Sequence, residues 1–84
     1  MKLYSIVIVN LGQIKNIKLL KAVSRGLKQL RVTRKLTQEQ VFNDTGIHVA
    51  RVETATYNIT ISTLDALCKY YGLTLKEFFN ELGS

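Results

Sequence analysis

The stretch LTQEQVFNDTGIHVARVE, residues 36–53, decides the fold. Thr37 stands three residues before Gln40, and this capping-box spacing predicts the start of a helix. Apolar residues recur behind it among polar ones, as expected of short helices with one buried side. The stretch predicts two short helices, residues 38–44 and 46–54.

Two further helices are expected downstream, at residues 61–71 and 75–82. Thr60 or Ser62 can cap the first of them, Gly72 can end it in a left-handed conformation, and Thr74 with Glu77 forms a second capping box. Their apolar positions follow helical spacing: Leu64, Leu67, Cys68 and Tyr71 in one, and Leu75, Phe78, Phe79 and Leu82 in the other. These two helices are predicted to close a hydrophobic core.

Upstream, Val23, Leu27 and Leu30 predict a first helix that begins at about residue 13 or 20 and ends near residue 35. The segment LYSIVIV near the N-terminus is rich in β-branched residues and favours an extended strand. A lone strand leaves its backbone groups unpaired. Residues 1–16 are therefore expected to be an extension that either pairs with its equivalent in a second chain, is an ill-ordered leader, or partly lengthens the first helix. Residues 17–84 are expected to form one all-α domain.

Composition excludes several classes of protein. A chain of 84 residues with 46% hydrophobic content suits one small folded domain. Its single cysteine, Cys68, and single histidine, His48, provide neither a disulfide nor a structural zinc site. We found no nucleophile–base motif and no phosphate-binding glycine loop, and no run of about 20 apolar residues for a membrane span. We therefore expect a cytoplasmic protein without enzymatic activity, cofactor or metal.

Charge is divided unevenly along the chain. Nine basic residues and no acidic one precede residue 38, whereas the remaining residues carry three basic and six acidic groups. This asymmetry favours a polyanionic partner, although a solvated charged face would have the same composition. Within this segment, Lys15, Lys18, Lys21, Arg25 and Lys28 follow helical spacing. These residues can contact the sugar-phosphate backbone of a nucleic acid, contact an anionic membrane, or form a solvated surface without a partner.

The segments LKQLRVTRKLTQEQV and RVETATYNITISTLDALCKYYGLTLKEFF together resemble the helix-turn-helix domain of the Cro and phage-repressor family of regulators. The resemblance covers residues 23–82. It implies a compact five-helix domain that places its third helix in the major groove of DNA.

The unit formed by the second helix, the turn and the third helix is about three residues shorter than the family pattern, which corresponds to about 4.5 Å of helix. Two registers are compatible with this deletion. In the first, Gly46 is the turn glycine and the recognition helix has lost its first turn. In the second, which we prefer because it supplies an N-cap, the turn is Asn43–Asp44, Thr45 caps the recognition helix, and Gly46, Ile47 and His48 form its first turn.

The resemblance also implies residue roles. Arg51 matches an outward position that contacts bases, Gln38 matches a phosphate-binding glutamine, and Arg31 with Glu53 matches a structural ion pair. Glycine is usual in the family where this chain has Ala55, which would be strained at positive φ. The DNA-contacting residues expected on this basis are Arg34, Lys35, Thr37, Gln38, Thr45, Gly46, Ile47, His48, Arg51, Thr54, Thr56, Tyr57 and Asn58.

These features predict a sequence-specific DNA-binding regulator, which we expect to be a repressor that binds as a homodimer. Two alternatives stay open. One is an antitoxin that represses its own promoter and binds a protein partner through residues 1–16. The other is a protein-interaction module on the same fold that no longer binds DNA.

Overall fold

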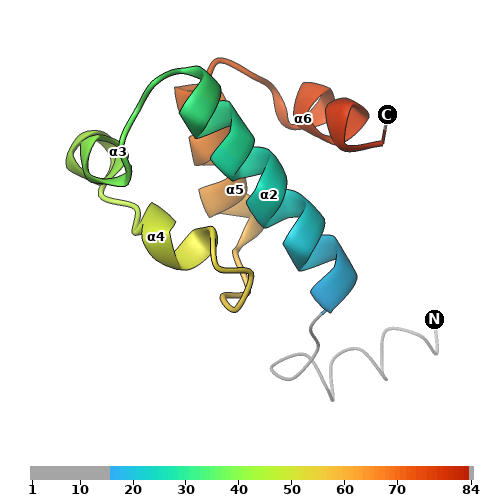
Figure 1. The fold of residues 1–84 in the computed structure, drawn as a ribbon. Helices are drawn as coiled ribbons and strands as arrows, with labels where there is room; N and C mark the ends of the chain where they lie inside the picture. Colours follow the sequence, from blue (N-terminus) through green and yellow to red (C-terminus); the bar gives the residue numbers. More distant parts are fainter. Residues whose placement is uncertain (1–15, 84) are drawn as a thin grey trace, which may run out of the picture.

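The structure, a computed structural model, describes residues 16–83. This part is all-helical and contains no strand. Its elements are α2 (Ile17–Thr33), α3 (Gln38–Thr45), α4 (Val49–Val52), α5 (Ile61–Tyr70) and α6 (Leu75–Leu82) (Figure 1). The expected all-helical fold is confirmed, and the largest difference is that α4 is much shorter than predicted. The alternatives for residues 1–15 lie outside the described residues.

Side-chain caps begin four of these helices. Asn16 accepts a hydrogen bond from the backbone N–H of Leu19, and Thr60 accepts one from that of Thr63. Complete capping boxes begin α3, at Thr37, and α6, at Thr74. Because these bonds satisfy backbone N–H groups that a helix leaves unpaired, they define where each helix starts.

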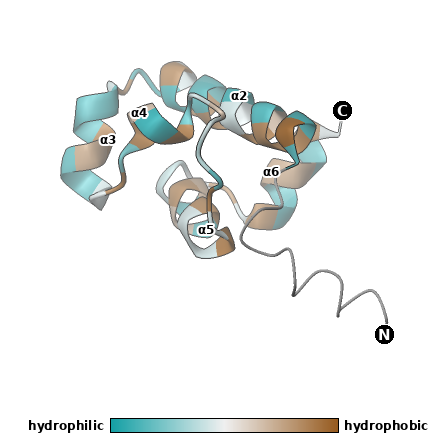
Figure 2. Cartoon of the chain, turned by 90° about the horizontal axis from the view of Figure 1, so that it is seen from below, coloured by the Kyte–Doolittle hydropathy of each residue, from teal (hydrophilic) through white to brown (hydrophobic). Residues whose placement is uncertain are grey.

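The core lies where α2, α3, α4, α5 and α6 meet, and their apolar sides turn inward (Figure 2). Helices α2, α4 and α5 each contribute two or more buried side chains at helical spacing, as the sequence predicts, whereas α3 contributes Val41 alone and α6 contributes Phe78 alone. Cys68 is completely buried among them, which agrees with its expected role in packing. The expectation for Phe79 is wrong, since this side chain is 41% exposed, while Leu75 and Leu82 pack partly buried against the core. The buried cluster consists of Val23, Leu27, Val41, Val49, Val52, Leu64, Leu67, Cys68, Tyr71 and Phe78.

Helix α2 separates the other elements: α3 and α4 lie on one side of it and α6 on the other (Figure 1). A Cβ added at Gly26 of α2 would lie 2.8 Å from a side-chain carbon of Leu82 and 3.2 Å from one of Phe78, so α6 approaches α2 closely at this glycine. In the described part of the chain, no helix is long and apolar enough to cross a membrane.

Candidate nucleic-acid interface

The turn between α3 and α4 begins at Gly46. This residue has φ of +75° and donates its backbone N–H to the carbonyl of Phe42 at 2.7 Å, which ends α3 in a left-handed conformation. Thr45 is the last residue of α3. Its hydroxyl donates to the carbonyl of Val41 at 2.7 Å and accepts from the N–H of Ile47 at 3.0 Å. Thr45 therefore bridges the end of α3 to the turn.

The register that we prefer from the sequence is wrong. Asn43 and Asp44 lie within α3, and α4 begins only at Val49, without a side-chain N-cap. The missing residues therefore come from the front of the recognition helix. Ile47 explains this outcome, because it is partly buried against the core and would face outward in the other register. The packing of an apolar side chain outweighs the cap that Thr45 could have supplied.

Helix α4 is a single turn of four residues with one buried and one exposed side. Val49 and Val52 are each 2% exposed and fix the inner side in the core. Arg51 and, just before the helix, His48 are exposed on the outer side. The turn is about 6 Å long, which is half the width of the major groove of B-DNA, about 12 Å.

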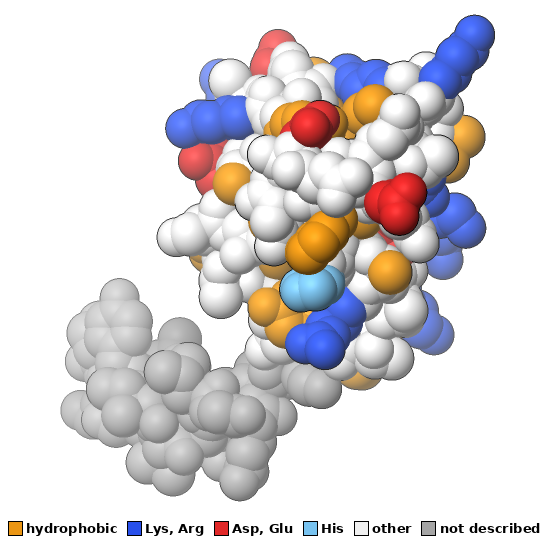
Figure 3. All heavy atoms as spheres, turned by 90° about the vertical axis from the view of Figure 1, so that its left-hand side faces the viewer, with side chains coloured by type: hydrophobic (Ala, Val, Ile, Leu, Met, Phe, Trp, Pro, Cys, Tyr) orange, Lys and Arg blue, Asp and Glu red, His pale blue; other side chains and the backbone are white. Residues whose placement is uncertain are grey.

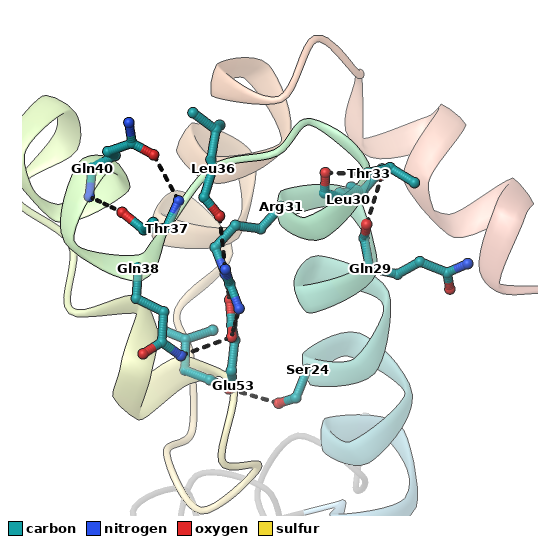
Figure 4. A network of polar contacts seen from close by, with 11 residues as sticks. Ser24, Gln29, Leu30, Arg31, Thr33, Leu36, Thr37, Gln38, Gln40 and Glu53 are labelled. Carbon is teal, nitrogen blue, oxygen red and sulfur yellow. Dashed lines mark hydrogen bonds and ion pairs between the residues drawn. The ribbon is translucent and has the colours of Figure 1, made fainter.

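An ion pair ties the end of α4 to α2. The guanidinium of Arg31 donates to both carboxylate oxygens of Glu53, at 2.7 and 3.0 Å, and to the carbonyl of Leu36 at 2.8 Å (Figure 4). Both side chains are largely buried, with 11% of Arg31 and 5% of Glu53 exposed. Hydrogen bonding to Glu53 raises the pKa of Arg31 further above its usual value. The two residues that the sequence pairs as structural thus meet between the first helix and the end of α4.

Gln38 joins the same network. Its side-chain amide donates to Glu53 at 2.9 Å from the first residue of α3 (Figure 4). Since a primary amide has two N–H donors and a carbonyl oxygen, this bond leaves donor and acceptor capacity unused. The bond also fixes the start of α3 relative to the end of α4.

Ser24 is a structural residue that the sequence analysis missed. It is buried, and its hydroxyl donates to the carbonyl of Val52 at 2.7 Å. This bond satisfies a carbonyl at the end of α4 and holds the helix against α2. Its position beside Val23 in the buried stripe of α2 is a signal that could have revealed it.

Aromatic rings support both exposed basic side chains of the turn and α4. The ring of His48 lies 4.7 Å from that of Phe42, and the guanidinium carbon of Arg51 lies 5.8 Å from the ring centre of Tyr57. The second distance is within the range of a cation–π interaction. On the face formed by α3 and α4, Figure 3 shows the histidine beside a hydrophobic and a basic side chain. Phe42 was not among the predicted site residues, because its partner His48 becomes its neighbour only through the turn.

A hollow of about 200 Å³ lies beside these side chains. The residues that line it are Gly46, Ile47, His48, Arg51, Val52, Tyr57 and Thr63.

The loop after α4 is constrained by its own hydrogen bonds. The Thr54 hydroxyl donates to the carbonyl of Arg51 and lies 2.7 Å from that of Thr56. Ala55 has φ of +62°, the conformation in which the sequence analysis expects strain. The loop therefore holds Thr54 and Thr56 next to the end of α4. Tyr57 lies beneath the Arg51 guanidinium, and Asn58 is exposed.

At the end of α2, Arg34 and Lys35 are exposed. Lys35 has φ of +57°, and the N–H groups of Lys35 and Leu36 bond to the carbonyls of Val32 and Arg31. These two bonds form a Schellman motif in which lysine occupies the position that glycine usually takes. The motif turns the chain directly into the N-terminus of α3.

Two buried groups lie beneath this surface. Burial raises the pKa of Cys68 to about 11 and that of Tyr71 to about 12. The Tyr71 hydroxyl has no hydrogen-bond partner among the described residues. Within residues 16–83 there is also no group of three or more His, Cys, Asp or Glu residues placed to hold a metal ion.

A protein-family model described as helix-turn-helix matches residues 27–78. The matched segment runs from the middle of α2 into α6 and contains the whole α3–turn–α4 unit. Neither curated proteins nor solved structures give a significant match to the chain.

Proposed function

The chain belongs to the helix-turn-helix family of the Cro and phage-repressor type, a family of DNA-binding regulators, and from this premise we propose that it is a sequence-specific repressor that reads DNA through the outer side of α4. The observation that supports this most directly is that two exposed basic side chains, Arg51 on α4 and His48 just before it, adjoin Val49 and Val52, which are fixed in the core. Rigid support matters because a base-reading group loses affinity if it must first be ordered.

Arg51 is proposed as the main base contact. A guanidinium can donate two parallel hydrogen bonds to O6 and N7 of guanine in the major groove, which is worth about 1–3 kcal/mol of discrimination. Tyr57 holds the guanidinium from below, so its orientation is restricted before binding. His48 and the exposed backbone at Gly46 border the same hollow and are proposed to contact the neighbouring base edges.

Sequence-independent contacts are proposed on both flanks of α4. On one side, the first backbone N–H groups of α3 and the Gln38 amide face a phosphate, with Arg34, Lys35 and Thr37 close by in the chain. On the other side, Thr54, Thr56, Tyr57 and Asn58 contact the next phosphates. Thr45 and Ile47 belong to the turn and are proposed to shape it, since Thr45 is bonded within it and Ile47 packs on the core.

A selection from random duplex DNA tests the proposal. The unmodified chain is expected to enrich a consensus, and Arg51→Ala should lower the preference for consensus over scrambled DNA by about 5- to 150-fold. Lys76→Ala removes one exposed positive charge from α6 and is the control. It should leave the preference unchanged. Absence of any enriched sequence would contradict the proposal.

Repression needs a separate test. Transcription in vitro from a promoter that overlaps the selected site should fall as the protein is added. The same promoter with a scrambled site should be unaffected, because a repressor of this kind acts by occupying its site. A rise in transcription would instead indicate an activator.

A further inference from the structure

Four basic residues form an exposed stripe along α2, hereafter the α2 stripe: Lys18, Lys21, Arg25 and Lys28. With 3.6 residues per turn, they fall within an arc of about 80° of the helix. Three of the four precede residue 27, where the match to the family model begins. The match to the family model therefore covers only one of the four residues of the stripe.

The contacts of α2 place the stripe relative to α4. Ser24 and Arg31 point toward α4, because they bond to Val52 and Glu53, whereas Gly26 faces α6. Helical spacing puts Lys21 and Lys28 within about 60° of Ser24 and more than about 130° from Gly26. Lys21 and Lys28 thus adjoin the α4 side of α2, while Lys18 and Arg25 lie about 100–120° from Ser24, on the outer surface of the helix. Figure 3 agrees, since Lys and Arg side chains line the right-hand edge of the face that carries α3 and α4, the edge formed by α2.

The charges of the stripe are uncompensated within the described chain. Helix α2 contains no acidic residue, and none of the four side chains forms an ion pair with residues 16–83. The pairs Lys18–Lys21, Lys21–Arg25 and Arg25–Lys28 bring like charges together at spacings that destabilise a helix. Lys18 also stands in the first turn, where the helix dipole disfavours a positive charge. Such an arrangement costs stability until an anion neutralises it.

We propose that the α2 stripe is a second contact surface for the sugar-phosphate backbone of DNA, which extends the footprint beyond the turn and α4. This inference rests on the proposed function. A membrane surface is the less suitable polyanion, because an amphipathic helix must insert its apolar side. In α2 that side, with Leu20, Val23 and Leu27, is buried in the core.

The proposed interaction would be independent of base sequence, which gives it a distinct signature. Neutralising Lys21 and Lys28 with Lys21→Gln/Lys28→Gln should weaken binding to consensus and scrambled duplexes by similar factors. The slope of log binding constant against log salt concentration should become shallower by about 0.9 for each phosphate that the variant no longer neutralises. The ratio of the two affinities should stay unchanged, since every base-reading side chain is still present.

Lys69→Gln/Lys76→Gln is the control for net charge, because it also removes two positive charges, here from α5 and α6. Unlike the stripe residues, Lys69 pairs with Asp65 at 3.0 Å, so the control also breaks one exposed ion pair. The control should leave the salt slope unchanged. Thermal unfolding of both variants checks that each is folded, and the α2 variant is expected to be at least as stable as the unmodified chain, because like-charge pairs have been relieved.

The outcomes separate the two proposals. If the unmodified chain prefers a consensus but both variants change the salt slope equally, or neither does, the stripe inference is wrong and the proposed function stands. If the α2 variant instead loses binding to phosphatidylserine vesicles with DNA binding intact, the partner is a membrane and the inference is also wrong. If the unmodified chain binds no DNA, both proposals fail.

Discussion

At the scale of single residues, two side chains occupy a backbone conformation that suits glycine. Lys35 and Ala55 have φ of +57° and +62°. The left-handed region costs a residue with a Cβ roughly 1–2 kcal/mol. Both positions adjoin the proposed interface: one leads into α3, and the other lies in the loop after α4.

We expect Ala55→Gly to raise the free energy of unfolding by about 0.5–1 kcal/mol, since relief of strain outweighs the added flexibility of the unfolded chain. Urea denaturation measures the change. Gly72→Ala is the opposite substitution at φ of +88° and should destabilise by about 1 kcal/mol or more. Lower stability of Ala55→Gly would mean that the alanine methyl group, which is partly buried, contributes more by packing than its backbone costs.

Tyr71 is a further residue at which a single substitution should change the free energy of unfolding. Its buried hydroxyl has no hydrogen-bond partner among the described residues, so Tyr71→Phe should raise the free energy of unfolding by about 1 kcal/mol. Burial also raises its pKa from 10.0 to about 12. The unfolded chain therefore loses the proton first as pH rises from about 10 to 12, and stability falls in this window.

Denaturant titrations at several alkaline pH values separate these effects. Tyr71→Phe should remove the part of the decline between pH 10 and 12, whereas the contribution of Cys68, whose pKa is about 11, should persist from about pH 9 to 11. An identical pH profile for the variant and the unmodified chain would show that Tyr71 does not titrate differently on folding.

At the scale of elements, α4 depends on contacts outside itself. An isolated turn of four residues is far below the length at which helices are stable in water. Val49 and Val52 hold it from the core, Ser24 bonds its last carbonyl, and Arg31 with Glu53 ties its end to α2. The orientation of Arg51 is therefore a property of the whole α2–α4 junction.

We expect Glu53→Ala to lower the free energy of unfolding by about 3 kcal/mol, because it leaves the largely buried charge of Arg31 unpaired. The double variant Arg31→Leu/Glu53→Leu should be less destabilised than this single variant, since no charge is then left without its partner. Urea denaturation of the two single leucine variants and the double variant completes the cycle. Strictly additive effects would show that the two side chains are not coupled.

The elements also show what sequence could and could not predict. The starts of α3 and α6 were predicted from capping boxes, which are local signals that the structure contains intact. The start of α4 was not, because two local signals conflicted: Thr45 is a good N-cap and Gly46 is a good helix end. The decision came from Ile47, whose burial depends on the assembled core. Phe42 escaped prediction for the same reason, since the fold brings His48 to it. The buried position of Ser24 in α2 could have been predicted from its place in the apolar stripe, but its bond to Val52, 28 positions away, could not.

At the scale of the whole molecule, the shortness of α4 limits the number of base pairs that it can contact. A turn of about 6 Å spans about two base pairs at 3.4 Å each. Each correct pair is worth only about 1–3 kcal/mol, so one domain cannot discriminate strongly by α4 alone. We therefore expect affinity to depend on backbone contacts, including those proposed for the α2 stripe, and specificity to depend on the binding of a second domain.

We therefore expect selected DNA to contain two inverted half-sites, each with about two or three strongly conserved base pairs, whose centres are about 10 base pairs or a multiple of this apart. A symmetric dimer places its two α4 helices at this spacing on one face of the duplex. Inserting five base pairs between the half-sites rotates one of them by about half a helical turn and should abolish tight binding, whereas inserting ten should largely restore it if the dimer can span the added length. Gel-shift titrations on these duplexes measure the effect. Equal affinity for all three spacings would mean that the two half-sites are bound independently, and a single conserved half-site would mean that one chain suffices.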